Sequence, residues 1–454
     1  MNLDGPVRAA DTAGSGDATV TLSFSAWSEG HVSATTHTLA VLPPKPGTKD
    51  EPVAANLIGS LIQPDRKASV WGIEFSKDGK HLLTAGYPSG IVQIWDWTAN
   101  SVVRRIDTPP GLRGSAEYAL ISPDWKTLYV PVEKRTVKQS ERDGKRIARV
   151  EQSGEIRIWD LSTGKEKDPI KPAEGTSPTY AKLSPDGRFL IYIQRSGYEA
   201  GQLQKDTTII CDLEGGKKSK LCDGYGTTVF APDGKTVAVD VNDYETKTDV
   251  LKLFDVVTGK ELAKLACPEK DLSFSLRGFS LDGSLIAVCP GGKLGAPHEV
   301  WFRDGKTLED RGRFIGDADP KGYGWAGGKF TPDSRHYVVF DGKGKGHVWD
   351  IGGKKVSRTL DIGVNAWRLV FSPNGTTLAV AWAPKGDEDQ DGARDPDPRD
   401  LQQPRVTLFD LAGTKPPRVL IAPHGYVGGL AFSPDSKTLA FGGTGAVHLF
   451  DLTK

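Results

Sequence analysis

The densest group of potential metal ligands in the sequence is an acidic segment at residues 387–400. Asp387, Asp389 and Asp391 alternate with other residues, Gly392 follows directly, and Asp395 lies three residues further on. Alternating carboxylates around a glycine turn suit a hard cation such as Ca²⁺, which prefers oxygen ligands. Calcium is therefore the one cofactor that the sequence suggests, with these four aspartates as its ligands. The alternative is a solvated acidic loop that binds no ion.

This segment resembles the first half of an EF-hand loop and then departs from it. The twelfth position, which is a bidentate glutamate in that motif, is Pro398 here, and the apolar eighth position is Arg394. No flanking helices are predicted. Both interpretations of the acidic segment therefore stay open.

A basic segment lies at residues 133–152, which contain seven cationic and four acidic residues. The cationic residues are Lys134, Arg135, Lys138, Arg142, Lys145, Arg146 and Arg149. We predict an exposed loop here, and Lys134, Arg135, Arg142 and Arg146 are candidate contacts for a partner. Opposite charges on two loops would orient a charge-patterned partner. The alternative is that both loops serve solubility alone.

Catalytic motifs are missing from the sequence. The eight histidines are scattered, and Cys211, Cys222, Cys267 and Cys289 fit neither a zinc site nor a disulfide framework. There is no H-E-x-x-H, P-loop, dinucleotide fingerprint or G-x-S-x-G. We predict a protein without enzymatic activity. The alternative is an enzyme, or a protein that binds a small ligand or metal, whose site residues converge from separate repeats at a central channel.

One short motif organises the elements that would position these residues. It occurs eight times, as SKDGK (76–80), SPDWK (122–126), SPDGR (184–188), APDGK (231–235), SLDGS (280–284), TPDSR (331–335), SPNGT (372–376) and SPDSK (433–437). Proline presets φ for a type I turn, and glycine accepts the positive φ that returns the chain. Apolar runs flank each copy, so each copy predicts a hairpin turn.

A third strand in each repeat ends in an aromatic–aspartate pair, most clearly at Trp95-Asp96, Trp159-Asp160 and Trp349-Asp350. A tight turn and a fourth strand follow. Four short strands per repeat are typical of a propeller blade. In repeat five, Trp301-Phe302-Arg303 stands where the pair is expected, so we expect that pair to be lost.

The combination of SPDG-like turn and terminal Trp-Asp resembles the WD40 repeat family over roughly residues 55–454. The resemblance implies an all-β fold, a single closed propeller of eight four-stranded blades, and a function in protein binding. The Gly-His pair of the family is missing from nearly every repeat. At His424-Gly425 the same two residues occur in reverse order. The polar network of the family is therefore not carried over.

Ring closure follows from the position of the last repeat. Repeat eight ends after its third strand, and residues 56–62 have strand character, so we predict that they supply its missing outer strand. We divide the chain into residues 1–45, an N-terminal extension, and 46–454, the propeller. The extension has a candidate β-hairpin around residues 28–30, which we expect on the rim of blade eight. The alternative is a remnant of an upstream domain.

Each repeat also carries an aromatic residue near the start of its innermost strand. These residues would lie near the mouth of the channel, where they could anchor a partner, or they would pack between blades. The eight are Trp71, Tyr118, Tyr180, Tyr225, Phe274, Trp325, Trp367 and Tyr426. Trp71, Tyr118, Tyr180, Trp325, Trp367 and Tyr426 are retained as candidate contacts.

The long insertions fall almost entirely between the second and third strands, so all of them emerge on one face. We expect a protein or peptide partner on this loop-rich face. Lys+Arg and Asp+Glu both total 58, which gives no overall attraction to nucleic acid or to a membrane. We expect a cytoplasmic monomer, or an exported protein if a signal precedes this sequence. A docking module of a longer multidomain protein is a further alternative.

Overall fold

In a computed structural model, the eight SPDG-like turns recur with the same backbone geometry. The structure describes residues 19–28, 31–40, 57–63, 69–87, 89–109, 113–114, 119–142, 145–199, 206–224, 226–243, 248–268, 273–291, 297–318, 327–340, 344–362, 366–382, 405–421 and 427–454. In the first copy the Ser76 amide donates to the His81 carbonyl at 2.9 Å, and the Ser76 hydroxyl donates to Asp78 at 2.6 Å. The residue at the glycine position has positive φ in all eight copies: Gly79, Trp125, Gly187, Gly234, Gly283, Ser334, Gly375 and Ser436.

Each turn joins the innermost strand of a blade to its second strand. The innermost strands are β4 (Ser69–Phe75), β9 (Leu120–Ile121), β13 (Thr176–Leu183), β18 (Thr228–Phe230), β22 (Ser273–Phe279), β26 (Gly327–Phe330), β30 (Ala366–Phe371) and β34 (Leu430–Phe432). The second strands are β5 (His81–Tyr87), β10 (Thr127–Arg142), β14 (Phe189–Ser196), β19 (Thr236–Asp243), β23 (Leu285–Gly291), β27 (His336–Phe340), β31 (Thr377–Trp382) and β35 (Thr438–Gly442).

The third and fourth strands complete each blade. The third strands are β6 (Val92–Asp96), β11 (Lys145–Asp160), β16 (Thr207–Asp212), β20 (Thr248–Asp255), β24 (Pro297–Asp304), β28 (Lys345–Asp350), β32 (Arg405–Asp410) and β36 (Ala446–Asp451). The outermost strands are β7 (Ser101–Ile106), β12 (Glu166–Ile170), β17 (Lys218–Asp223), β21 (Glu261–Ala266), β25 (Asp310–Ala318), β29 (Lys355–Asp361), β33 (Arg418–Ile421) and β3 (Leu57–Ile62). Blade two also includes β8 (Arg113–Gly114) and β15 (Tyr198–Glu199).

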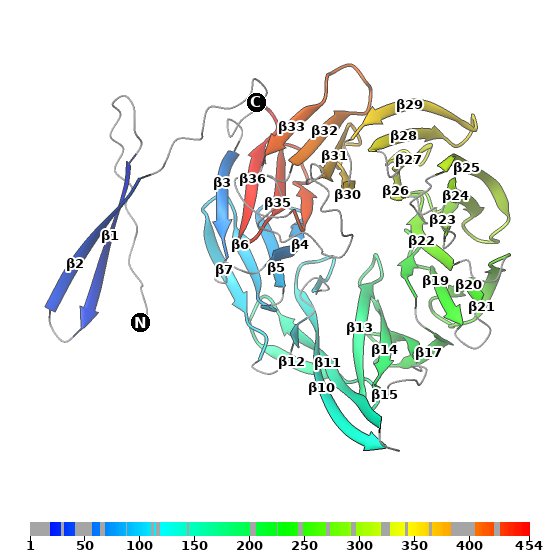
Figure 1. Cartoon of the computed structure of the whole chain (residues 1–454), viewed down its shortest axis with the longest axis horizontal. Coiled ribbons are helices and arrows are strands. Elements are labelled where there is room, and N and C mark those ends of the chain that lie inside the picture. Colours follow the sequence, from blue (N-terminus) through cyan, green and yellow to red (C-terminus); the bar gives the residue numbers. More distant parts are fainter. Residues whose placement is uncertain are drawn as a thin grey trace. The chain divides into compact units, whose positions relative to one another are not determined.

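The eight sheets form a closed ring, which confirms the predicted eight-bladed all-β propeller (Figure 1). Innermost strands contact each other at β9–β13, β13–β18, β18–β22, β22–β26, β26–β30, β30–β34 and β34–β4. Eight apolar clusters lie between consecutive blades. Leu251 and Leu253 of blade four, for example, pack with Ile286 and Val288 of blade five. Burying a side chain of this size contributes about 1.5–3 kcal/mol, so the core is distributed around the ring.

The predicted closing strand is confirmed. β3 pairs with β36 and is therefore the outer strand of blade eight, with Leu61 opposite Val447. Leu61 is buried in the cluster that joins blade eight to blade one. We call β3 the clasp strand. It joins the two ends of the propeller and covers the sheet edge that would otherwise be exposed.

An aspartate ends the third strand of every blade and accepts amide hydrogen bonds from the turn that follows. In blade five the aromatic–aspartate pair is lost, as expected, because Arg303 takes the place of the aromatic residue, but the aspartate itself is kept. Asp304, one position beyond Arg303, accepts from the amides of Lys306 and Thr307 at 2.9 and 3.0 Å. Asp160 does the same for Ser162 and Thr163 in blade two. Blade five therefore keeps the turn.

The chain divides into two compact units, Met1–Glu51 and Pro52–Lys454. In the first, β1 (Thr19–Ser28) and β2 (His31–Ala40) pair as an antiparallel hairpin. The position of this hairpin on blade eight stays a prediction. No helix among the described residues is long and apolar enough to cross a membrane.

Candidate functional site

The innermost strands place charged side chains at the central channel. The residue two positions before the turn is Glu74 in blade one, Lys182 in blade three and Lys329 in blade six, and all three are exposed to water. Arg368 of blade seven lies two residues earlier relative to its own turn and is half-buried. The corresponding positions in the other blades are Leu120, Val229, Gly278, Val370 and Ala431. The described part of this ring therefore carries three cations and one carboxylate.

These exposed side chains nevertheless have shifted pKa values. Burial raises the pKa of Glu74 to about 6, against the opposing effect of Lys77. Burial lowers the pKa of Lys182 and of Lys329, and the positive charge of Arg368 lowers both further. The charge of Arg368 in blade seven therefore acts on a lysine of blade three as well as on one of the neighbouring blade six.

A second charged group lies between blades four and five. The buried carboxylate of Asp240 accepts from the Leu276 amide at 3.1 Å, and that of Asp249 accepts from the Phe274 amide at 2.9 Å. Burial raises the pKa of Asp240 to about 6, and the nearby charge of Asp249 adds to this rise. Both carboxylates on blade four therefore hold the innermost strand of blade five.

Three of the predicted channel aromatics lie at irregularities of innermost strands. The pairing register shifts at Trp71 in β4, at Tyr180 in β13 and at Trp367 in β30. Tyr180 has a φ of 51°, and the guanidinium of Arg195 lies 5.9 Å from the centre of its ring. β-Bulges of this kind redirect side chains and occur often near binding sites. Tyr118, Trp325 and Tyr426, and the side chain of Trp367, lie outside the described part of the structure.

The predicted basic loop of blade two is instead a regular β-ribbon. β10 and β11 pair without interruption from Thr127–Asp160 to Arg142–Lys145 (Figure 1). Lys134 and Arg135 are exposed, and Lys138 forms an ion pair with Glu151 at 2.7 Å. The loop expectation was wrong because alternating polar residues can continue a hairpin as well as they can form a loop. The side chains of Arg142 and Arg146 lie outside the described residues.

The register of this ribbon divides its basic positions between its two faces. Residues directly opposite each other in an antiparallel pair share a face, and the faces alternate along each strand. Between residues 134 and 153, positions 134, 138, 142, 145 and 149 fall in one alternating set, together with a single acidic position, 151. The other set contains basic positions 135 and 146 with acidic positions 133 and 141. We call the first set the basic face of the ribbon.

The acidic segment, with Asp387, Asp389, Asp391 and Asp395, lies outside the described residues, so calcium binding there stays a prediction. Among the residues that the structure does describe, no group of three or more His, Cys, Asp or Glu side chains is arranged to hold a metal. All four cysteines are buried thiols, not joined in disulfides.

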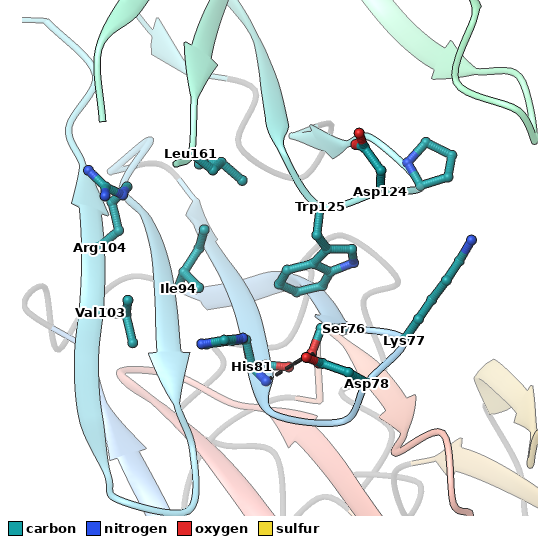
Figure 2. A pocket seen from close by; sticks show the side chains of 11 residues that line it. Ser76, Lys77, Asp78, His81, Ile94, Val103, Arg104, Asp124, Trp125 and Leu161 are labelled. Carbon is teal, nitrogen blue, oxygen red and sulfur yellow. Dashed lines mark hydrogen bonds between the residues drawn. The ribbon is translucent and has the colours of Figure 1, made fainter. Parts of the chain in front are cut away.

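Hollows between consecutive blades lie on the opposite face, where the short turns emerge. One, of about 520 Å³, is lined by Lys77, His81 and Arg104 of blade one and by Trp125 of blade two (Figure 2). A matching hollow of about 520 Å³ between blades six and seven is lined by the equivalent residues, including His336 and Arg358. Gly375 stands there in the place of Trp125.

Trp125 is a residue that sequence reasoning missed. It occupies the turn position held by glycine in five other blades, with φ of 59°, and its side chain is half-buried against the cluster between blades one and two. A bulky residue at positive φ is an outlier that costs about 1–3 kcal/mol. The signal was present in SPDWK, where tryptophan replaces the expected glycine.

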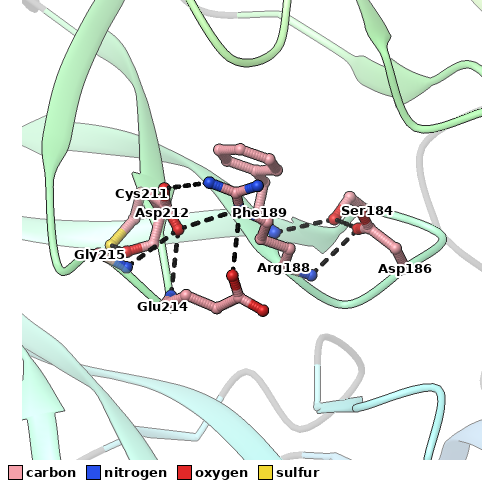
Figure 3. A network of polar contacts seen from close by, with 8 residues as sticks. All are labelled: Ser184, Asp186, Arg188, Phe189, Cys211, Asp212, Glu214 and Gly215. Atoms are coloured by element: carbon pink, nitrogen blue, oxygen red, sulfur yellow. Dashed lines mark hydrogen bonds and ion pairs between the residues drawn. The ribbon is translucent and has the colours of Figure 1, made fainter.

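A polar network in blade three ties its two turns together (Figure 3). Arg188 follows the first turn and donates to Asp212, which ends the third strand, at 3.0 Å. Its guanidinium lies 4.9 Å from the centre of the Phe189 ring. Asp212 also accepts from the amides of Glu214 and Gly215. All of its members are engaged within the blade, so we assign the network a structural role.

The comparisons with known proteins agree with this architecture. Residues 56–96 match the model described as "WD domain, G-beta repeat". The C-terminal WD40 domain of Sif2 is similar in structure, with a TM-score of 0.58 and 12% identity over 87% of this chain and 98% of that one. The computationally designed Ika8 protein gives a TM-score of 0.54 and 16% identity over 86% and 99%. No curated protein matches the sequence. The chain therefore shares the propeller fold of these structures, and its clasp strand and the first three strands of blade one match the WD repeat model.

Proposed function

We propose that this protein is a non-enzymatic interaction scaffold that binds an acidic segment of a partner protein on the loop-rich face of the propeller. The observation that carries the proposal is the basic face of the blade-two ribbon, with five cationic positions against one acidic position between residues 134 and 153. Its described members, Lys134 and Lys138, are exposed. Complementary charge steers partners and fixes their orientation.

A protein partner fits this surface better than nucleic acid does. The other face of the ribbon balances two basic against two acidic positions, and the whole chain has no net charge. Nucleic-acid binding relies on many cations that neutralise phosphates. The alternating geometry of a ribbon also suits an extended peptide, whose side chains alternate with the same period.

The test compares two charge reversals of equal size. Lys134→Glu with Arg142→Glu alters the basic face, and Arg135→Glu with Arg146→Glu alters the other set. The probe is a short labelled peptide that alternates Glu and Thr. Partners are also captured from nuclease-treated native extract and quantified by mass spectrometry. We expect the first pair to weaken binding about tenfold, equivalent to 1.4 kcal/mol, and the second pair to change it little.

A shortened ribbon serves as an independent variant. Position 134 is paired with 153, so an Asn-Gly turn can join them after removal of residues 135–152. Loss of the same partners would support the proposal. An unchanged set of partners, equal effects of both charge reversals, or binding that nuclease treatment abolishes would contradict it.

A further inference from the structure

We propose that the hollow between blades one and two is a docking site for an extended segment of a partner protein that presents an apolar side chain beside a carboxylate. This hollow, of about 520 Å³, lies on the face where the short turns emerge and is lined by side chains of both blades (Figure 2). The ribbon surface lies on the opposite face, so the two sites are separate.

The hollow between blades six and seven, also of about 520 Å³, provides an internal comparison. The strand register places the residues of the two hollows in equivalent positions. Arg104 lies opposite Ile94 in blade one, as Arg358 lies opposite Val348 in blade six. The differences between the two hollows therefore show what is specific to blades one and two.

Two of these differences add apolar surface. Val103, which is 52% exposed on β7, stands where blade six has Ser357. Trp125, with a φ of 59°, stands in the place of Gly375, and its indole points from blade two toward Ile94 (Figure 2). Backbone strain of this kind is concentrated at functional sites, and tryptophan is a frequent anchor of binding energy. The wall of the hollow therefore suits an apolar side chain.

A third difference is the role of the arginine. In blade six, Arg358 donates to the Asp410 carbonyl of blade seven at 2.8 Å, so its guanidinium ties the two blades together. Among the described residues, the equivalent Arg104 has no hydrogen bond or ion pair. Its side chain lines the hollow, and a carboxylate that entered could accept two parallel N–H bonds from its guanidinium.

A fourth difference is a second cation, because Lys77 is exposed where blade six has Pro332. Its charge also acts on Glu74, which does not line the hollow. The two carboxylates that do line it, Asp78 and Asp124, are engaged in their own turns. Each accepts from the hydroxyl two residues before it, at 2.6 and 2.5 Å. The charges of the hollow therefore favour an acidic segment.

The hollow adjoins a second one between blades two and three, of about 720 Å³. The two share Lys77, Pro123 and Asp124 as lining residues. A compact small molecule would occupy one of them, whereas an extended segment can lie across both. This continuity favours a peptide segment over a small ligand.

The test selects peptides from a phage-displayed library of short random sequences on the full-length protein and measures the affinity of the enriched peptides by fluorescence polarisation. One variant gives the hollow the residues of its counterpart, Val103→Ser with Trp125→Gly. A second removes its charge, Lys77→Gln with Arg104→Gln. The matched control is Val356→Ser with Lys80→Gln, an exposed valine and an exposed lysine that do not line the hollow. Thermal unfolding checks that each variant is folded.

We expect the enriched peptides to share an acidic residue close to an apolar one. Each site variant should weaken their binding at least tenfold, while the control keeps it. Absence of enriched peptides, enriched peptides without an acidic residue, or equal loss in the control would overturn the proposal.

Sedimentation of the wild type tests a different occupant. A dimer that Trp125→Gly abolishes would identify a second copy of this chain in the hollow and would also overturn the proposal. The ribbon charge reversals should leave the affinity of the enriched peptides unchanged, so this test succeeds or fails independently of the proposed function.

Discussion

The hydroxyl oxygen of Ser60 lies 2.9 Å from Nδ1 of His448, although the two residues are 388 positions apart in the chain. Ser60 lies on the clasp strand and His448 on β36, so this contact is one of those that close the ring. Around it, Leu61 is buried and Ile62 is half exposed. The ring therefore closes through the few residues of β3. Of these, the side chain of Leu61 packs in the core and that of Ile62 is exposed.

Leu61→Ala should destabilise the propeller by about 2–5 kcal/mol, because it removes a fully buried side chain and leaves a cavity. Ile62→Ala, one residue later and 50% exposed, should change stability by less than about 1 kcal/mol. Urea unfolding followed by tryptophan fluorescence measures both. Equal effects of the two substitutions would contradict the assignment of β3 as the closing strand.

Asp304→Asn tests the turn of blade five, in which the aspartate follows Arg303 and not an aromatic residue. A hydrogen bond from Arg311, at 2.7 Å, and amide hydrogen bonds lower the pKa of Asp304 to about 2 from 3.8. A lowered folded-state pKa gives stability that is present above the unfolded value and is lost as pH falls through about 2. The difference in unfolding free energy between wild type and variant should therefore shrink from pH 5 to pH 2. A constant difference would show that the carboxylate is not engaged.

Asp240→Asn should have the opposite pH dependence. Burial raises the folded-state pKa of Asp240 to about 6 from 3.8. A raised pKa gives stability that is present below the unfolded value and is lost as pH rises through about 6. Relative to the variant, the wild type should lose stability between pH 4 and pH 7, as measured by denaturant unfolding at several pH values. A parallel pH profile for the two proteins would refute this assignment.

Trp125→Gly should leave stability within about 1 kcal/mol of the wild type, because relief of the positive-φ strain offsets the apolar contacts that are lost. Gly375→Trp, at the equivalent turn, should destabilise by about 1–3 kcal/mol because a bulky residue would have to adopt the positive φ that glycine holds there. Thermal unfolding compares both. A large loss in Trp125→Gly would mean that the hollow in Figure 2 depends on the indole for packing.

The turns show why so much of the fold was accessible from the sequence. The hydrogen bonds of Ser76 link it to Asp78, Gly79 and His81, so residue types a few positions apart decide the geometry. Asp160 likewise accepts hydrogen bonds from the amides of Ser162 and Thr163, which are only two and three residues later. The difference in blade five was also local: Arg303 takes the place of the aromatic residue, while Asp304 lies opposite Leu285 as Asp96 lies opposite His81, and only the strand pairing reveals this.

The sequence by itself determined the number of blades, the positions of their turns and the identity of the closing strand. Each of these follows from local backbone preferences and from the alternation of buried and exposed residues along a strand. Only the tertiary structure decided that five basic positions share one ribbon face, because the register of β10 against β11 sets that grouping. Only ring closure lets the charge of Arg368 in blade seven act on Lys182 in blade three. Such an interaction depends on the distance between residues in space, and their separation along the chain does not reveal it.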